Sequence, residues 1–310
     1  MTKSSLASWL SYLEQLHPKA IDLGLERIAE VGDRLSLRAT PPKTLTVAGT
    51  NGKGSCVAVM DAALRAAGYR VGVYTSPHLV HFNERIVIDG QAVSDQSICD
   101  AFDAIETARG DITLSYFEFA TLAGLWLFRQ ARVDIQILEV GLGGRLDGVN
   151  ILDADVAVVT SIGLDHTDWL GDTRELIAIE KAGIARAGKP VVVADADLPS
   201  TLLPELTRIG AKIIQLDRDW TITGDILRRD TTLAMTLPKP SGLLNRNIAA
   251  ALIALDALGI DIRTQATYDA VSGLTLAGRR QHIDFQGVDL VLDVAHNRES
   301  VAILIAALVA

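Results

Sequence analysis

Short apolar runs alternate along the chain with longer amphipathic stretches. Five runs rich in valine and isoleucine lie at 44–48, 71–74, 134–140, 155–160 and 190–194. Amphipathic stretches of helical length lie at 55–67, 117–128 and 173–184. Continuous apolar runs separated by helices are typical of parallel strands that are buried on both faces. The pattern therefore predicts an α/β fold with a mostly parallel sheet flanked by helices, and ligands at the carboxyl ends of the strands.

The pattern changes from about residue 217. Segment 217–237 is polar and alternating, which predicts a hairpin region, and a helix follows at 247–258. Two further strands are predicted at 281–285 and 289–294. The last ten residues, V-A-I-L-I-A-A-L-V-A, read as an apolar helix without a cap, so we expect the natural chain to continue.

Composition excludes several classes of protein. The net charge of the 310 residues is -9 and no basic stripe is visible, which argues against a nucleic-acid partner. No apolar run approaches the ~18 residues of a membrane span, and the N-terminus has no apolar core of a signal peptide. Cys56 and Cys99 form no C-x-x-C motif. We therefore expect a cytoplasmic protein without a zinc or redox site.

The strongest local signal is V-A-G-T-N-G-K-G-S at 47–55, between a predicted strand and a predicted helix. Its glycines allow backbone N–H groups to converge on an anion, and Lys53 adds a positive charge. It departs from the usual G-x-x-x-x-G-K-[ST] loop, because Val47 stands at the first glycine and Gly54 separates Lys53 from Ser55. The context nevertheless predicts a phosphate-binding loop.

Two polar residues follow other apolar strands. Glu139 opens E-V-G-L-G-G-R-L-D, and His166 lies in S-I-G-L-D-H-T. If their strands are neighbours, a carboxylate and an imidazole meet where a divalent cation can bind. The simpler alternative is a solvent-facing carboxylate and a loop histidine.

Lys181 lies on the same helical face as Ile177 and Ile184. Extension of its side chain to solvent is the more common arrangement for such a lysine. Burial would instead favour the neutral amine, which can react with carbon dioxide to form a metal-binding carbamate.

Together these stretches resemble the Mur ligase superfamily, and most closely its folate branch of dihydrofolate synthases/folylpolyglutamate synthases. The resemblance runs from W-L-S-Y-L-E-Q-L-H at residue 9 to D-V-A-H-N at 293–297, and it includes T-S-P-H-L and E-K-A-G-I. It implies an ATP- and pterin-binding domain over 1–286, followed at 287–310 by the beginning of a C-terminal glutamate-ligase domain.

The resemblance also implies residue roles. ATP would contact Thr50, Asn51, Gly52, Lys53, Gly54, Ser55, Asn247, Arg279, Asp293 and His296. Mg²⁺ would contact Ser76, Glu139, His166 and a carbamylated Lys181, and catalysis would use Lys53, Lys181 and His166. The pterin substrate would contact Asp22, Leu23, Gly24, Ser115, Tyr116, Phe117, Glu118, Leu146, Asp147 and Gly148.

The implied activity is ATP-dependent ligation of L-glutamate to 7,8-dihydropteroate through an acyl phosphate, with extension of the γ-glutamyl tail of tetrahydrofolate, by a monomer. Three alternatives stay open: glutamate chain extension alone, a P-loop ATPase, and a nucleotide-binding module without ligase activity.

Overall fold

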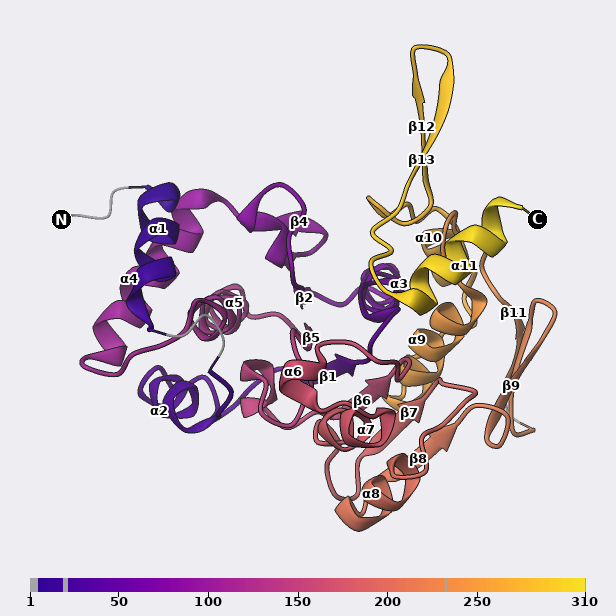
Figure 1. Cartoon of the computed structure of the whole chain (residues 1–310), viewed down its shortest axis with the longest axis horizontal. Helices are drawn as coiled ribbons and strands as arrows, with labels where there is room; N and C mark the ends of the chain where they lie inside the picture. The colour runs from indigo at the N-terminus through magenta and orange to yellow at the C-terminus, as the bar shows by residue number, and fades with distance from the viewer. Residues whose placement is uncertain (1–4, 19–21, 232, 310) are drawn as a thin grey trace.

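The computed structural model describes residues 5–18, 22–231 and 233–309. Its central feature is an eight-stranded sheet, in which the strand order is β4-β3-β2-β5-β1-β6-β7-β8 (Figure 1). The strands are β1 Lys43–Ala48, β2 Val71–Tyr74, β3 Ile86–Ile88, β4 Gln91–Ala92, β5 Ile135–Glu139, β6 Val156–Val159, β7 Pro190–Val193 and β8 Lys212–Gln215. The six strands from β2 to β8 in this order are parallel, and β3 and β4 pair antiparallel at one edge. The predicted sheet and its five strands are confirmed.

Alternate residues of each strand point to opposite faces, and both faces are buried. In β6, Val156 and Val158 belong to one core cluster, whereas Ala157 and Val159 belong to the other. The strands are therefore apolar at nearly every position, and this is why they could be recognised in the sequence.

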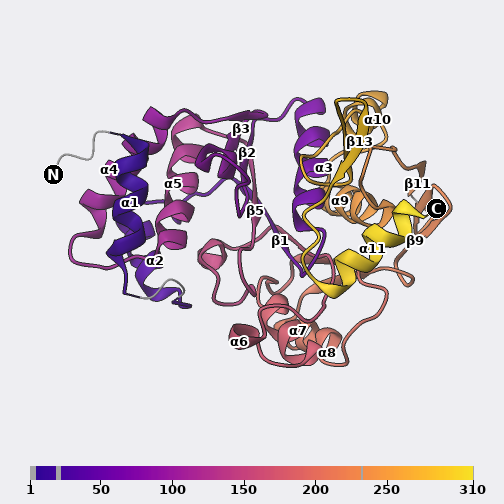
Figure 2. The ribbon, with the colours of Figure 1, turned by 45° about the horizontal axis from the view of Figure 1, so that its top comes forward.

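Helices cover both faces of the sheet (Figures 1 and 2). One layer contains α3 Lys53–Ala66, α9 Asn245–Ala257 and α10 Gln265–Ser272. The other contains α1 Leu6–Leu16, α2 Glu26–Arg34, α4 Asp95–Arg109, α5 Tyr116–Ala131, α7 Arg174–Ala182 and α8 Leu202–Ile209. The helices predicted at 55–67, 117–128, 173–184 and 247–258 correspond to α3, α5, α7 and α9.

The segment predicted as a hairpin region forms a small antiparallel sheet instead of a single hairpin. Its strands are β9 Trp220–Thr223, β10 Ile226–Arg229 and β11 Leu233–Thr236. Trp220, Leu227 and Leu233 are buried and join the core beside α9.

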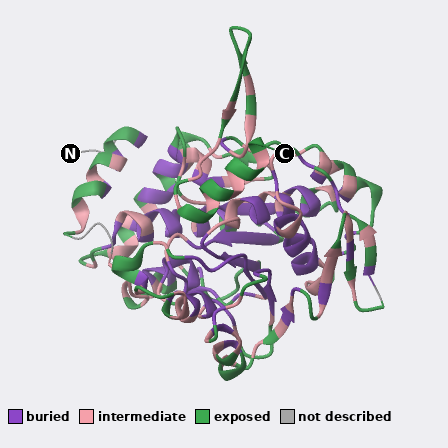
Figure 3. Cartoon of the chain, turned by 45° about the vertical axis from the view of Figure 1, so that its right-hand side comes forward, coloured by how far each residue is buried: buried purple, intermediate pink, exposed green. Residues whose placement is uncertain are grey.

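The C-terminal part projects from this body. Strands β12 Gln281–Phe285 and β13 Val288–Leu292 form an antiparallel hairpin whose residues are mostly exposed (Figure 3). The predicted domain boundary after residue 286 falls in its turn. Helix α11 Arg298–Leu308 follows and contains no buried residue. None of the described helices is long and apolar enough to cross a membrane.

Four loops that carry predicted site residues leave the sheet at one edge, at the carboxyl ends of β1, β2, β5 and β6. They bring together segments that are more than 100 residues apart, and the short helices η1 Phe82–Arg85, η2 Gly148–Ile151 and α6 Thr167–Leu170 lie within or beside them.

Candidate active site

The phosphate-binding loop is fastened to the loop that follows β6. Thr50 N donates to Ser161 O (2.8 Å), and Asn51 N donates to Ser161 Oγ (3.0 Å). Thr160 Oγ1 donates to Asn51 O (2.7 Å). These bonds order the loop without a ligand, so the cost of ordering it is not added when a phosphate binds.

The loop turns into α3 at Gly52, which has a left-handed φ of 91°. Lys53 is the first residue of this 14-residue helix, and its Nζ donates to Gly49 O (2.9 Å). The free N–H groups of the helix N-terminus and the lysine ammonium therefore present positive charge at one point.

A methyl group at Gly52 would lie 2.6 Å from Asn247 Nδ2. We expect Gly52→Ala to displace the Asn247 side chain and to weaken ATP binding at least about tenfold, in addition to a backbone strain of about 1–2 kcal/mol. The matched control is Gly68→Ala, because Gly68 also has a left-handed φ (86°) but has open space around it. Nucleotide titration of both variants checks this: equal ATP affinities for the two would refute the role given to Asn247.

A cavity of about 140 Å³ opens in front of the loop, and we call it the phosphate cavity. All four predicted metal ligands line it, as do Thr50, Asn51, Gly52, Lys53, Gly54, Arg279 and His296. The other predicted nucleotide contacts, Ser55, Asn247 and Asp293, line an adjoining pocket that also includes Asn51, Gly52 and Arg279. The structure thus brings all the predicted nucleotide residues to one region.

Glu139 ends β5 inside the phosphate cavity and is 6% exposed. Burial raises the pKa of its carboxyl, and the nearby Lys53 counteracts this. Among the described residues, its one hydrogen-bond donor is Ser76 N, at 3.3 Å from Oε2. Burying a carboxylate with so few partners costs free energy, and a bound cation would offset this cost.

Lys181 is buried, at 4% exposure, and lines the same cavity. No hydrogen-bond partner of Nζ occurs in the described part of the chain. Burial, and secondarily the charge of Lys53, lower the pKa of this lysine to about 7. The side chain therefore does not extend to solvent, and much of it is a neutral amine near physiological pH.

The expected adjacency of the Glu139 and His166 strands is wrong. Glu139 ends β5 and His166 follows β6, but β1 lies between these two strands and carries the phosphate-binding loop. Both side chains still line one cavity. The side chain of His166 is about half exposed, which suits a group that meets its ligand from the rim.

The donor set fits a divalent cation only if Lys181 carries a carbamate. Within the described residues, no group of three or more histidine, cysteine, aspartate and glutamate side chains is placed to hold a metal ion. Glu139, His166 and the Ser76 hydroxyl supply three donors of suitable type. The unpaired amine of Lys181 is where carbon dioxide could add a second carboxylate.

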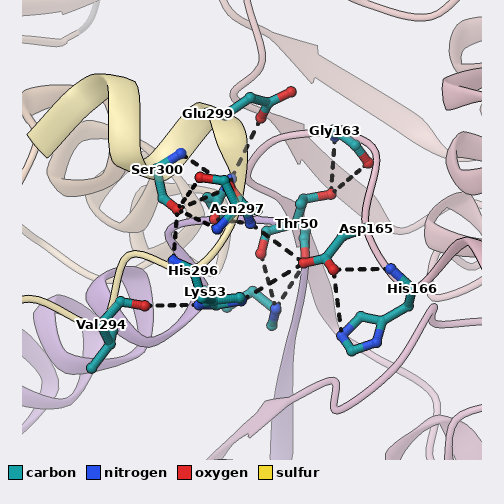
Figure 4. A network of polar contacts seen from close by, with 12 residues as sticks. Thr50, Lys53, Gly163, Asp165, His166, Val294, His296, Asn297, Glu299 and Ser300 are labelled. Carbon is teal, nitrogen blue, oxygen red and sulfur yellow. Dashed lines mark hydrogen bonds and ion pairs between the residues drawn. The ribbon is translucent and has the colours of Figure 1, made fainter.

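The segment before α11 contacts the phosphate-binding loop (Figure 4). Asn297 and Asn51 exchange side-chain hydrogen bonds of 3.0 and 3.2 Å. Asp165 accepts from Asn297 Nδ2 (3.4 Å) and lies 3.8 Å from His296 Nε2. Asn297, far along the chain from Asn51 and Asp165, therefore links two residues that line the phosphate cavity.

A second and larger cavity, of about 530 Å³, adjoins the first, and we call it the pterin cavity. Nine of the ten predicted substrate contacts line it: Asp22, Leu23, Gly24, Ser115, Phe117, Glu118, Leu146, Asp147 and Gly148. Tyr116 does not, because its ring packs on Phe82 with centroids 6.0 Å apart.

Two of the lining carboxylates also hold the local backbone. Glu118 accepts from Ser115 N (2.7 Å) and caps α5. Asp147 accepts from Leu142 N (2.8 Å) and Val149 N (3.0 Å), and burial raises its pKa to about 6. The sequence resemblance had pointed to these residues as substrate contacts, and they serve the fold as well.

Sequence reasoning missed Arg85, which also lines the pterin cavity. Arg85 lies nine residues after Ser76, beyond the T-S-P-H-L motif that carries the resemblance. Its position beside the cavity depends on packing against α5, some 30 residues later, which no local pattern reveals.

The chain matches known proteins over nearly its whole length. Residues 47–230 match the Mur ligase middle domain. The Escherichia coli (strain K12) dihydrofolate synthase/folylpolyglutamate synthase is 48% identical over 303 residues, which are 95% of this chain and 70% of that protein. The Haemophilus influenzae protein of the same name is 41% identical, over 95% of this chain and 71% of its own.

Solved structures are also similar to this chain. E. coli FolC in complex with DHPP and ADP superposes with a TM-score of 0.93 at 47% identity, and the match covers 98% of this chain and 74% of that one. A bifunctional folylpolyglutamate synthase/dihydrofolate synthase with Mn, AMPPNP and L-glutamate bound gives a TM-score of 0.92 at 46% identity, over 99% and 75% of the two chains.

Proposed function

The chain belongs to the Mur ligase family, in its dihydrofolate synthase/folylpolyglutamate synthase branch, and from this premise we propose that it joins L-glutamate to 7,8-dihydropteroate in an ATP-dependent reaction. The named relatives support both activities of the branch, so the proposal includes extension of the γ-glutamyl tail of tetrahydrofolate.

The observation that carries the proposal is a wall shared by the two cavities. Six residues line both of them: Ser76, Pro77, Gly141, Leu142, His166 and His296. A pterin–benzoate seated in the larger cavity can therefore present its carboxylate to a γ-phosphate held in the smaller one. Holding the two reactants in register supplies much of the rate of such a transfer.

Different residues of this chain have different roles in the proposed reaction. Lys53 and the N-terminus of α3 offset the negative charge of the phosphates, which would otherwise repel the substrate carboxylate. The carboxylate attacks the γ-phosphorus and displaces ADP, and the amine of L-glutamate then attacks the acyl phosphate and releases phosphate. Asn51 and Asp165 line the phosphate cavity and are linked through Asn297, and this contact limits hydrolysis by water.

A divalent cation would be held by Glu139, Ser76, His166 and a carbamate on Lys181, and would supply further neutralisation of the phosphate charge. The location, the oligomeric state and the domain bounds are inferred from the family resemblance and the composition. We place the protein in the cytoplasm, as a monomer, with residues 1–286 as the ATP- and pterin-binding domain and 287–310 as the start of the glutamate-ligase domain.

The proposal predicts ADP formation that depends on the pterin. With ATP, Mg²⁺ and L-glutamate, we expect ADP to be released when 7,8-dihydropteroate is added and not in its absence, because no acceptor carboxylate is then available. A coupled assay of ADP release checks this. ADP formed only with a tetrahydrofolate would restrict the enzyme to chain extension. ADP formed equally without any pterin would point to an ATPase and contradict the proposal.

A further inference from the structure

Among the described residues, Lys181 is the one buried lysine and Arg85 is the one buried arginine. Each lines one of the two cavities. A buried charge is costly unless it is paired. Lys181 can reduce this cost by losing its proton, but a guanidinium keeps its charge. Arg85 therefore needs an anion.

Packing holds the Arg85 side chain in one orientation. Its Nε donates to His78 Nδ1 (2.8 Å), and its guanidinium carbon lies 5.7 Å from the ring centroids of both Phe82 and Tyr116. Aromatic faces at this distance stabilise a cation without neutralising it. The side chain is thus fixed, while its charge is still available to a ligand.

Protein carboxylates do not complete the pairing. Across the described part of the chain, none lies within salt-bridge distance of Arg85. Arg27, by contrast, is paired with both Asp22 and Glu118, at 2.5 and 3.2 Å.

Acidic side chains outnumber lysine and arginine in the lining of the pterin cavity. Asp22, Glu118 and Asp147 are acidic, and Arg85 is the one lysine or arginine among the described lining residues. Arg85 O accepts from Thr75 N (3.0 Å), the residue before Ser76 in the shared wall. Arg85 therefore follows closely on the shared wall, and its guanidinium is a positive charge in the cavity from which the substrate carboxylate must reach the phosphate.

We infer that Arg85 binds the carboxylate of the pterin–benzoate substrate and directs it to the shared wall, and that His78 is a positioning residue that fixes the Arg85 guanidinium. The inference rests on the proposed function. It adds a determinant of specificity, because the cavity then selects pterins that carry an anionic tail over neutral ones.

The test compares 7,8-dihydropteroate with its carboxamide, which differs at the carboxylate alone. We expect the wild-type protein to bind the carboxylate about 10- to 100-fold more tightly than the carboxamide, as a charge-assisted hydrogen bond provides. Arg85→Met should lose this preference by weakening the carboxylate alone, and Arg85→Lys should keep part of it. The matched control is Arg70→Met, since Arg70 is an exposed arginine that pairs with Asp89.

His78 is tested in the same titration. His78→Phe removes the acceptor of Arg85 Nε and should weaken the carboxylate ligand but not the carboxamide, whereas His78→Gln retains an acceptor and should restore much of the loss. Intact ATP binding and an unchanged melting temperature would show that each variant is folded. If Arg85→Met does not fold, Arg85→Lys takes its place in the test.

Each outcome decides a separate point. The inference is wrong, while the proposed function stands, if folded Arg85→Met keeps the wild-type preference for the carboxylate over the carboxamide. The same conclusion follows if Arg85→Lys keeps that preference undiminished. If both ligands weaken equally in Arg85→Met, Arg85 is structural. If the wild-type protein binds neither ligand, the proposed function itself fails.

Discussion

Replacing Lys53 with alanine is expected to lower turnover about 100- to 1000-fold, the range found when one preorganised charge-stabilising donor is removed. Lys53 has no carboxylate partner in the described structure, and its Nζ rests on the carbonyls of Gly49 and Thr50. These neutral acceptors leave the ammonium free to move to a phosphate. Its charge is needed most as the γ-phosphoryl group is transferred, so kcat should fall more than the affinity for 7,8-dihydropteroate.

The measurement is steady-state ADP release with saturating 7,8-dihydropteroate and L-glutamate. Lys189→Ala is a suitable control, because Lys189 forms an exposed pair with Asp155 outside both cavities and should change neither turnover nor stability by much. A Lys53→Ala variant that retains more than about a tenth of the wild-type turnover would remove Lys53 from the phosphate site.

Burial explains which elements could be predicted. The five predicted strands are covered on both faces, so their sequences are almost wholly apolar. Strands β3 and β4 are three and two residues long at the sheet edge, and β8 has a single buried residue, so none has such a run. Helix α4 is not among the predicted elements, although its Ser94 cap and apolar spacing are visible in the sequence.

The same distinction applies to the site. Lys53 and Gly52 belong to a loop whose function depends on local spacing, so the sequence alone predicts them. The burial of Lys181 depends on what covers α7, and from the residues alone the exposed arrangement was the more common one. Arg85 acquires its role from Tyr116 on another element, and such long-range contacts leave no pattern in the local sequence.

Replacing Lys181 with methionine is expected to raise stability and to abolish ligation together. Methionine fills a similar volume without the buried charge, and replacing even paired buried charges with apolar side chains of similar volume stabilises proteins by up to about 1–4 kcal/mol. The loss of activity should reach or exceed the roughly 100-fold that follows from disturbing groups around a metal. The control is Ile177→Met on the same face of α7, which should change stability by less than about 1.5 kcal/mol.

The stability gain should depend on pH. Below about pH 7 the Lys181 ammonium is protonated in both the folded and the unfolded state, so the full cost of burying it is present. Between about pH 7 and its usual pKa of 10.5, the folded state carries the neutral amine while the unfolded state still binds a proton, so wild-type stability rises with pH. The advantage of Lys181→Met should therefore be largest near pH 6 and shrink by about 1.4 kcal/mol per pH unit above pH 7.

Denaturant unfolding of both proteins at pH 6, 7, 8 and 9 measures this difference, with chelator present and carbon dioxide removed so that neither metal nor carbamate stabilises the wild-type protein. Adding ¹³C-bicarbonate should then produce a carbamate resonance in the wild-type protein that Lys181→Met lacks, because only a neutral amine reacts with carbon dioxide. A stability difference that is independent of pH would mean that Lys181 is solvated or paired in solution. The same burial that makes this lysine a cost to the fold leaves it unprotonated, and that is the form in which it can become a ligand.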